Sequence, residues 1–346
     1  MEPVLERSFI KENLSGVVFF LFAAAALAVP LFVRALFPLH ILIMIFLYST
    51  LGTSWNILSG YAGQISLGQS VFVGIGGYTS SVLFVHWGVS PWLGMIAGVI
   101  LTVAFGWLIG KPCFRLSGRY FAIATMAVVQ IAYIVITRWE FVGGARGVYF
   151  PLKNWGLRYF AFRAKVPYYY IAFGLMLFSF LVVFLIEKSH IGYYLKTIRE
   201  DEDVARALGI DVPRYKSIAM AFSTMLAAMG GTFLAQYLLF ADPDSLFMLS
   251  IPIMLLTVMG GTGSIFGPLI GAGVLIPVQE YARVAWSGSG EALDQIVYGL
   301  IIVVIVIWQP RGIIGIFDRF CRSEAGKKAE AFPGILEKGR AENGAS

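Results

Sequence analysis

Long apolar runs, separated by short polar or glycine-containing segments, repeat along almost the whole chain. A helix that crosses the hydrocarbon of a bilayer needs about 20 mainly apolar residues. The runs that meet or approach this length are 16–37, 39–58, 62–85, 91–110, 119–137, 166–186, 216–240, 245–260, 263–285 and 292–308. Because backbone groups in lipid must bond within their own segment, these runs predict helices. The pattern predicts an all-α polytopic membrane helix bundle, residues 16–308, with about ten transmembrane helices.

Two glycine-punctuated segments, 56–81 and 259–273, interrupt this pattern. Irregular backbone survives at membrane depth only where protein or a water-filled path covers it. Both segments therefore predict the interior of a bundle, and their similar glycine patterns suggest an internal repeat of two halves. Close helix packing through small residues is one interpretation. The other is a translocation path lined by the polar residues of the first segment, Asn56, Gln64, Ser66, Gln69, Ser70, Tyr78 and Thr79.

The number and distribution of charged residues indicate the class of protein and its orientation in the membrane. Charged residues make up 13% of the 346 residues, about half of the share in soluble domains. Of the 26 Lys and Arg, 18 fall in the segments 1–15, 111–119, 187–216 and 309–346. Because cytoplasmic loops carry the excess of basic residues, we expect these segments and both termini to be cytoplasmic. The mixed charges of the tail, 309–346, predict that it is partly disordered.

One predicted external loop, 138–165, departs from this rule because it is basic and rich in aromatic residues. An interfacial belt of aromatic rings and snorkelling basic side chains explains it without a function. The alternative is a docking surface for an acidic partner, with Arg146 and Lys153 as candidate contacts.

Few ionisable groups lie within the predicted spans. Glu280 and Arg283, spaced i, i+3 near the end of one run, could pair with each other. A proton- or sodium-coupled carrier usually needs carboxylates at mid-membrane, and the sequence indicates none. Two cysteines and three scattered histidines predict no metal site. The sequence also lacks the glycine-rich phosphate loop of an ATPase and any nucleophile–base constellation. We expect a lipid environment and no nucleic-acid partner.

The most densely charged internal stretch is IREDEDVARALGIDVPRYKS, 198–217. Thr197 and Glu200 predict a capping box, and Gly209 predicts a left-handed end of the helix. Opposite charges four residues apart, and a small apolar patch, are the remaining signals: Lys196 with Glu200, Glu202 with Arg206, and the patch Val204, Ala205, Leu208 and Ile210. We expect a short helix at the cytoplasmic surface. It is either a solvated connector or a lever that inserts into a groove of a cytosolic partner.

Several stretches together resemble the permease subunits of branched-chain amino-acid ABC importers, a family that includes urea- and amide-type permeases. They are NILSGYAGQISLGQSVFVGIGGYTSS (56–81), GRYFAIATMAVVQI (118–131), GGARGV (143–148), IREDEDVARALGIDVPRYKSIAMAFSTMLAAMGG (198–231) and VMGGTGSIFGPLIGAG (258–273). The resemblance implies a multi-pass protein of the bacterial inner membrane. It also implies a second homologous permease subunit, two cytosolic ATPase subunits that carry ATP and Mg, and a periplasmic solute-binding protein.

The resemblance also implies that the loop 187–215 is the coupling segment for the ATPase. In this family the loop carries an acidic–Ala–Ala–x-x-x–Gly pattern, and here Val204 replaces the first Ala. The residues expected to couple are Arg199, Asp203, Val204, Ala205, Leu208 and Gly209. The basic loop would contact the binding protein.

The solute stays open at the level of sequence. Family members often carry an acidic residue in the span before the second glycine segment, where this chain reads SIPIMLL with Pro252. A proline can break or kink that span. Branched-chain amino acids, urea, short amides or another amino-acid-like solute all fit. A stand-alone channel or secondary carrier is the alternative of a different class, and it would have no need of a capped docking helix.

Overall fold

The computed structural model describes residues 26–30, 35–116, 118–150, 156–286, 299–300 and 313. The predicted spans 16–37 and 292–308, and the predicted terminal segments 1–15 and 309–346, lie wholly or mostly outside the described residues. The fold is an all-α bundle with one two-residue strand pair. The count of about ten spans and the internal repeat stay predictions.

Five described helical segments are long and apolar enough to cross a membrane: Leu36–Tyr61 (helix α2, Leu36–Asn56, continued by a π-turn, Ile57–Tyr61), α4 (Pro91–Cys113), α5 (Arg119–Arg138), α6 (Lys165–Lys188) and α9 (Val212–Leu238). Two more long helices, α3 (Gln69–Trp87) and α12 (Gly267–Trp286), carry more polar and glycine positions. The shorter helices are α7 (His190–Glu200), α8 (Glu202–Ala207), α10 (Pro243–Phe247) and α11 (Ser250–Gly260).

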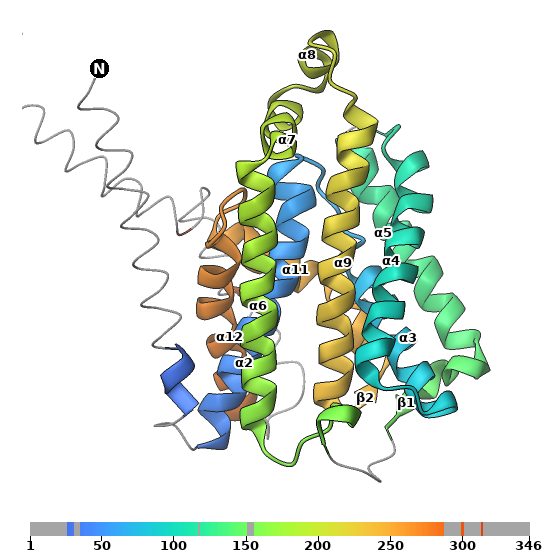
Figure 1. The fold of residues 1–346 in the computed structure, drawn as a ribbon, viewed down its shortest axis with the longest axis vertical. Coiled ribbons are helices and arrows are strands. Elements are labelled where there is room, and N and C mark those ends of the chain that lie inside the picture. Colours follow the sequence, from blue (N-terminus) through green and yellow to red (C-terminus); the bar gives the residue numbers. More distant parts are fainter. Residues whose placement is uncertain are drawn as a thin grey trace, which may run out of the picture.

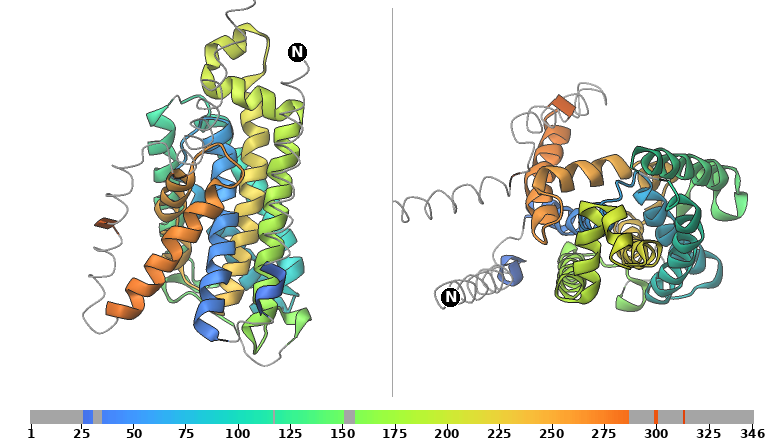
Figure 2. Two further views of the ribbon diagram at one scale, coloured as in Figure 1. Left: turned by 90° about the vertical axis from the view of Figure 1, so that its left-hand side faces the viewer. Right: turned by 90° about the horizontal axis from the view of Figure 1, so that it is seen from above.

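Helix α9 lies at the centre of the bundle. It packs against α2, α3 and α4, and α2 in turn packs against α6 and α12 (Figures 1 and 2). In the most apolar part of α9, 72% of residues are buried, against 17% in α5. Helix α5 is therefore peripheral, and most of its surface is free to meet lipid, water or another subunit.

Glycine allows α3 and α9 to pack backbone against backbone. A Cβ at Gly76 would lie 2.4 Å from the Ala228 carbonyl oxygen, and a Cβ at Gly231 would lie 2.0 Å from the Val73 carbonyl oxygen. Both distances are far below a normal contact, so no larger residue fits either position without separating the helices. For these glycines the packing interpretation is confirmed.

The predicted span 62–85 is wrong in its first part. Residues 62–68 are irregular and double back from the end of the π-turn, so that Gln69, which begins α3, bonds Ser54 of α2 at 2.8 Å. Polar groups inside the protein satisfy this loop. Trp55 Nε1 donates to the Ser66 carbonyl at 2.7 Å, and Thr125 Oγ1 accepts from the Leu67 amide at 3.0 Å. These bonds hold the loop against the bundle, although Gly63 and Ile65 stay exposed.

The predicted span 245–260 is also interrupted. Helix α10 ends at Phe247, two turn residues follow, and α11 begins at Ser250. Pro252 lies in the first turn of α11, where helical N–H groups have no partner in the helix, so its missing donor costs little. It marks the restart of the helix rather than a kink within it.

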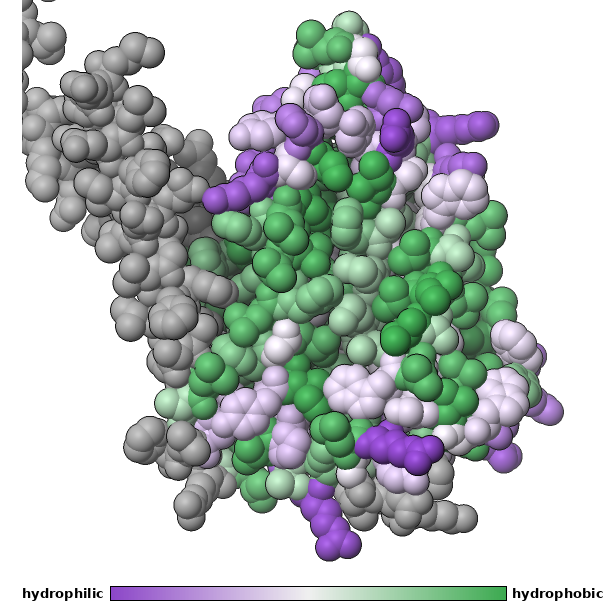
Figure 3. Space-filling view, in the orientation of Figure 1, coloured by the Kyte–Doolittle hydropathy of each residue, from purple (hydrophilic) through white to green (hydrophobic). Residues whose placement is uncertain are grey.

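The bundle has two ends of different construction. Helices α7 and α8 form one end, here named the α8 end (Figure 1). The other, the sheet end, holds the antiparallel pair of β1 (Val148–Tyr149) and β2 (Phe240–Ala241). Three 3₁₀ turns, Glu140–Val142, Gly144–Arg146 and Leu157–Tyr159, belong to the loops near this sheet. Figure 3 shows a mainly apolar band between two ends that carry the polar surface.

Candidate functional site

The charged stretch forms two helices rather than the single capped helix that the sequence predicted. Asp201 has an extended backbone and separates helix α7 from helix α8. Its carboxylate accepts hydrogen bonds from the amides of Asp203 (2.8 Å) and Val204 (3.1 Å). Thr197 lies inside α7, where its hydroxyl donates to Tyr193 O. The predicted capping box is therefore wrong. Asp201 caps α8 instead, because a carboxylate is favourable at the positive N-terminal end of a helix.

The end of α8 follows the prediction. Gly209 has a φ of +82°, its amide donates to Arg206 O, and the Ile210 amide donates to Ala205 O. This pair of bonds is the Schellman motif, which closes a helix with a left-handed glycine. Asp211 then caps α9 by accepting from the Arg214 amide at 3.2 Å. Because both ends of α8 are closed by local bonds, the helix has a defined position at the tip of the bundle.

The predicted apolar patch divides into an outer and an inner part. Val204 is 52% and Leu208 70% exposed, whereas Ala205 is fully buried against Ile198 and Val212. Ala205 therefore holds α8 to α7 and α9 and is not free for a partner. Figure 3 shows apolar surface at the tip, over α8, within an otherwise polar end.

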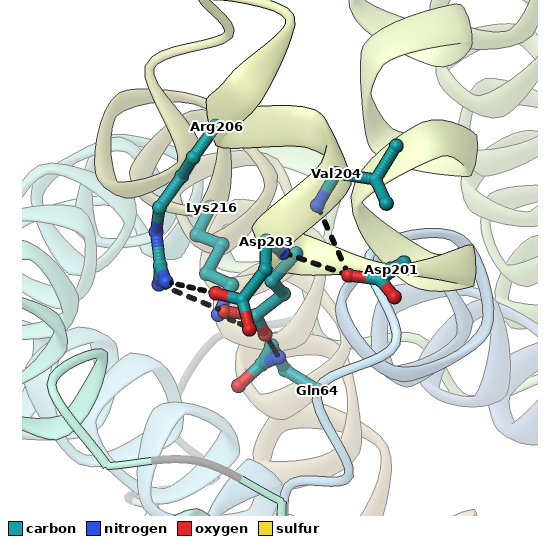
Figure 4. Close-up of polar contacts among 7 residues, drawn as sticks. Gln64, Asp201, Asp203, Val204, Arg206 and Lys216 are labelled. Atoms are coloured by element: carbon teal, nitrogen blue, oxygen red, sulfur yellow. Dashed lines mark hydrogen bonds and ion pairs between the residues drawn. The ribbon is translucent and has the colours of Figure 1, made fainter.

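Glu202 is the hub of the charged contacts beneath α8, and Figure 4 labels its partners Gln64, Arg206 and Lys216. Its Oε1 accepts from Lys216 Nζ at 2.6 Å and from Gln64 Nε2 at 2.9 Å, and its Oε2 lies 3.3 Å from Arg206 Nη2. Lys216, in α9, is 1% exposed. The predicted Glu202–Arg206 pair is confirmed, whereas Lys196 pairs with Glu187 and not with Glu200. A single carboxylate thus ties α8 to α9 and to the irregular loop 62–68.

Asp203 lies outside this hub. Its carboxylate is 89% exposed and pairs with Arg206 Nη1 at 2.7 Å. An exposed pair of this kind contributes little to stability. Asp203 is therefore a surface residue next to the outward-facing Val204.

Arg199 joins α7 to both glycine segments. Its Nη1 donates to Gly60 O at 2.7 Å, at the carboxyl end of the π-turn, where helical carbonyls lack partners and a cation is favoured. A Cβ at Gly63 would lie 3.1 Å from Arg199 Cα, and one at Gly263 would lie 2.3 Å from Arg199 Nη1. The small residues therefore make room for the arginine side chain.

Asn56 ties the two glycine segments to each other. Its Oδ1 accepts from the Gly263 amide and its Nδ2 donates to Ser264 O, both at 2.8 Å. The segments that resemble each other in sequence are thus neighbours in space. A displacement of Arg199 would reach both of them.

Most of the predicted path residues hold the bundle together. Gln69 donates to Ser54 and Ser223, Ser70 bonds Ser250 through both its amide and its hydroxyl, and Ser66 accepts from the Gly68 amide. With Asn56 and Gln64, five of the seven have structural partners. The exceptions are Thr79, which is half-buried, and Tyr78, which is 3% exposed and whose hydroxyl has no hydrogen-bond partner among the described residues.

The sheet end carries the candidate docking residues. Arg146 is exposed at the close of its 3₁₀ turn. Lys153 lies outside the described residues. Trp87, Trp139 and Tyr149 are also exposed at or near this end, with 54% to 70% of their surface free. Arg283 pairs with Glu280 at 3.3 Å, as the i, i+3 spacing predicted, and Glu280 also lies 3.7 Å from His40.

Sequence reasoning did not identify several of these contacts. Lys216 was counted only as a loop charge, although a lysine at the start of an apolar helix needs a partner if it is buried. Glu202 was seen only as half of a local pair. Among the described residues, no group of three His, Cys, Asp or Glu could hold a metal ion.

Comparisons with known proteins identify the family of the chain. The family described as "Branched-chain amino acid transport system / permease component" matches residues 37–306. The chain is 28% identical to the high-affinity branched-chain amino acid transport system permease protein LivM of Escherichia coli (strain K12), over 90% of this chain and 77% of the relative. It is 25% identical to the corresponding protein LivH of the same organism, over 78% of this chain and 91% of the relative.

The match to a solved structure, PsaBC from Streptococcus pneumoniae in complex with Fab, covers 82% of this chain and 95% of the matched chain in that structure, with 13% identity and a TM-score of 0.44. The identification therefore depends on the sequence matches, and the apolar helices fit it. The permease relatives are transport components rather than enzymes. This chain is a multi-pass membrane protein and belongs to the family of permease components of branched-chain amino acid transport systems.

Proposed function

We propose that the chain is the membrane-spanning permease subunit of a binding-protein-dependent ABC importer for branched-chain amino acids. It pairs with a second, homologous permease, and the solute passes between the two. The chain is similar to both LivM and LivH, which are two different permease proteins of the high-affinity branched-chain amino acid transport system in one organism. This similarity to both supports the pairing of two homologous permeases. Two cytosolic ATPase subunits bind ATP and Mg and hydrolyse the ATP, since this chain has no phosphate loop.

In this proposal the α8 end is cytoplasmic and α7–α8 is the coupling segment. The exposed Leu208 and Val204 enter a groove of the ATPase, as an amphipathic helix enters an apolar groove. Movement of the ATPase then displaces α7 and α8 together, because Asp201 and the buried Ala205 hold them as one body.

The contact of Arg199 with both glycine segments carries the proposal. It connects the surface that would meet the ATPase to two irregular loops of the bundle, 62–68 and 261–266. Such loops have few helical bonds of their own, so they change conformation at lower cost than a continuous helix. The Glu202 contacts with Gln64 and Lys216 give the same movement a second route into loop 62–68 and into α9.

The sheet end is then periplasmic and faces the solute-binding protein. Arg146 is exposed there and offers a positive contact to an acidic surface. Both termini are cytoplasmic in this proposal, as the distribution of basic residues predicts.

Reconstitution tests the proposal. The chain, its partner permease, the ATPases and the binding protein are placed in proteoliposomes, and uptake of labelled leucine, urea and acetamide is measured with ATP and with a non-hydrolysable analogue. ATP-dependent uptake of leucine supports the proposal. ATP-dependent uptake of urea or acetamide alone would keep the importer and change its solute, and uptake by the chain alone without ATP would favour a channel or carrier.

A further inference from the structure

The connection between α4 and α5 carries three basic side chains, here named the basic turn: Lys111, Arg115 and Arg119. All three are exposed, and none of them forms an ion pair with another described residue. The sequence has no Asp or Glu in α4, in α5 or between them, so these elements supply no carboxylate. The basic side chains of the hub beneath α8, in contrast, are paired. The positive charge of the basic turn is therefore free for a partner.

Local contacts hold the basic turn in a defined position. The helical winding of α4 continues through Arg115, whose amide donates to Pro112 O at 3.3 Å. Lys111 and Arg115 are four positions apart in this winding, so they lie on the same face. The Phe114 ring stacks on the fully buried Phe121 of α5, with 5.7 Å between the ring centroids. This stacking fixes the end of α4 against the start of α5.

An exposed apolar stripe on α4 leads to the basic turn. Its members recur every three or four residues, and so share one face of the helix: Ile96, Ile100, Ala104, Trp107 and Leu108. The opposite face of α4 packs against α3 and α9. From Ile96 to Leu108 the stripe extends for about 18 Å, which exceeds the roughly 15 Å of hydrocarbon in one leaflet. The stripe is therefore long enough to contact an acyl chain over its whole length.

Trp107 and Lys111 lie where the apolar stripe meets the basic turn. The Lys111 ammonium is 3.8 Å from the centroid of the Trp107 ring, in a cation–π contact, and the ring is 54% exposed. Tryptophan rings and the lysines of span ends both favour the headgroup level of a bilayer. The basic turn is on the side of the α8 end, but it lies lateral to α7 and α8 on the outside of the bundle (Figures 1 and 2). Its neighbours there are lipid headgroups.

We propose that the basic turn binds the phosphate of an anionic phospholipid whose acyl chains lie along the apolar stripe of α4. The guanidinium groups of Arg115 and Arg119 offer paired donors to phosphate oxygens, and the Lys111 ammonium adds a compact charge. A zwitterionic headgroup would bring its own cation against three positive charges without a carboxylate, so the turn selects an anionic headgroup. This inference depends on the membrane location of the chain and not on the proposed function, so the two can fail separately.

Lipid affinity of the purified full-length chain in detergent tests the site, with the melting temperature followed during titration. The wild type should bind phosphatidylglycerol at least about tenfold more tightly than phosphatidylcholine with the same acyl chains. Lys111→Gln with Arg115→Gln should weaken binding of phosphatidylglycerol about tenfold or more, because each basic group near the membrane surface contributes to the attraction. Lys196→Gln with Arg214→Gln removes the same charge from exposed residues of the same end and should stay within about twofold. Equal weakening by the two double variants would overturn the site.

Fluorescence quenching locates the lipid without any change of charge. Phosphatidylglycerol that is brominated on its acyl chains quenches tryptophans beside it. Trp107→Phe should remove a larger share of this quenching than Trp139→Phe, because Trp139 is equally exposed but lies at the sheet end. Equal shares would show that the lipid has no preferred position and would overturn the site. If Lys111→Gln with Arg115→Gln loses the ATPase subunits while its affinity for phosphatidylglycerol is unchanged, the occupant is an acidic protein surface and the proposal is wrong.

Discussion

The two ends of the bundle differ in what their charged and aromatic side chains contact. At the α8 end one carboxylate, Glu202, meets Lys216, Gln64 and Arg206 beneath an apolar tip of Val204 and Leu208, while charges such as Asp203 stay exposed around that tip. At the sheet end the aromatic rings pack together, and charged groups such as Arg146 and Asp244 face outward. An apolar tip within a polar end suits a protein groove, whereas exposed charge without such a tip suits a soluble protein.

The two ends also differ in the contacts that their residues make. At the α8 end, Arg199 and Glu202 contact Gly60 and Gln64, so the surface helices and the irregular loop 62–68 form one connected unit. The sheet end also has a long-range contact, Tyr133 with Asp244 across 111 positions, but its strand pair joins β1 and β2 at only two residue pairs. We infer that the α8 end transmits movement and the sheet end receives partners and solute.

The largest expected effect comes from placing charge on the apolar tip. Val204→Asp with Leu208→Asp should weaken co-purification of the ATPase subunits by about 30-fold or more, because apolar anchors dominate such contacts. The matched control is Leu157→Asp at the sheet end, since Leu157 and Leu208 are both 70% exposed. If the control loses the ATPase as completely as the tip variant, the contrast between the ends is wrong.

The next effect concerns the hub beneath α8. Lys216→Met leaves Glu202 without its shortest contact and should lower the free energy of unfolding by about 2 kcal/mol. Lys196→Met breaks the more exposed pair with Glu187, and the expected loss is below about 1 kcal/mol. Thermal unfolding of the two purified variants measures the difference. Equal melting temperatures would mean that the hub contributes no more than a surface pair.

A smaller effect is expected for the sheet end. Arg146→Glu should slow uptake about threefold to tenfold when the binding protein is limiting, with less effect at high salt, because screening weakens contacts between exposed charges. Uptake rates over a range of binding-protein concentrations measure this. Arg214→Glu, exposed but in the first turn of α9, controls for charge reversal alone. Unchanged uptake by Arg146→Glu would reduce the loop to an interfacial belt.

The smallest effect is expected for Gly209→Ala, at the end of α8. A Cβ at Gly209 would have nothing within 4 Å, so Gly209→Ala is strained only by its φ of +82°. A left-handed alanine costs roughly 1 kcal/mol. We expect a loss of uptake below about twofold, whereas Gly209→Arg adds bulk and charge beside Leu208 and should abolish ATPase co-purification. Equal losses for the two variants would show that backbone strain alone explains the phenotype.

Local features were predictable because they depend on neighbours in sequence. The end of α8 at Gly209 and the pairs Glu202–Arg206 and Glu280–Arg283 involve residues within four positions of each other. The boundaries of α4, α5 and α6 also follow the apolar runs to within three residues. The sequence predicted a helix for loop 62–68 because the loop contains no proline, although it contains Gly63 and Gly68.

Contacts between distant segments were beyond the reach of the pattern. Lys216 meets Glu202 from 14 positions away, Tyr133 meets Asp244 from 111, and Arg199 meets Gly60 from 139. The two residues of each pair meet only after the helices that carry them have packed together. The sequence could therefore place the coupling stretch, but not the residues through which it reaches the membrane loops.

The central claim is that Arg199 carries movement from α7–α8 to the glycine segments. The most direct measurement is the ratio of leucine taken up to ATP hydrolysed by the Arg199→Gln complex in proteoliposomes. The account predicts that the ATPases still bind and hydrolyse ATP, because Val204 and Leu208 are intact, while uptake per ATP falls more than about tenfold. A ratio equal to that of the wild type would contradict the claim.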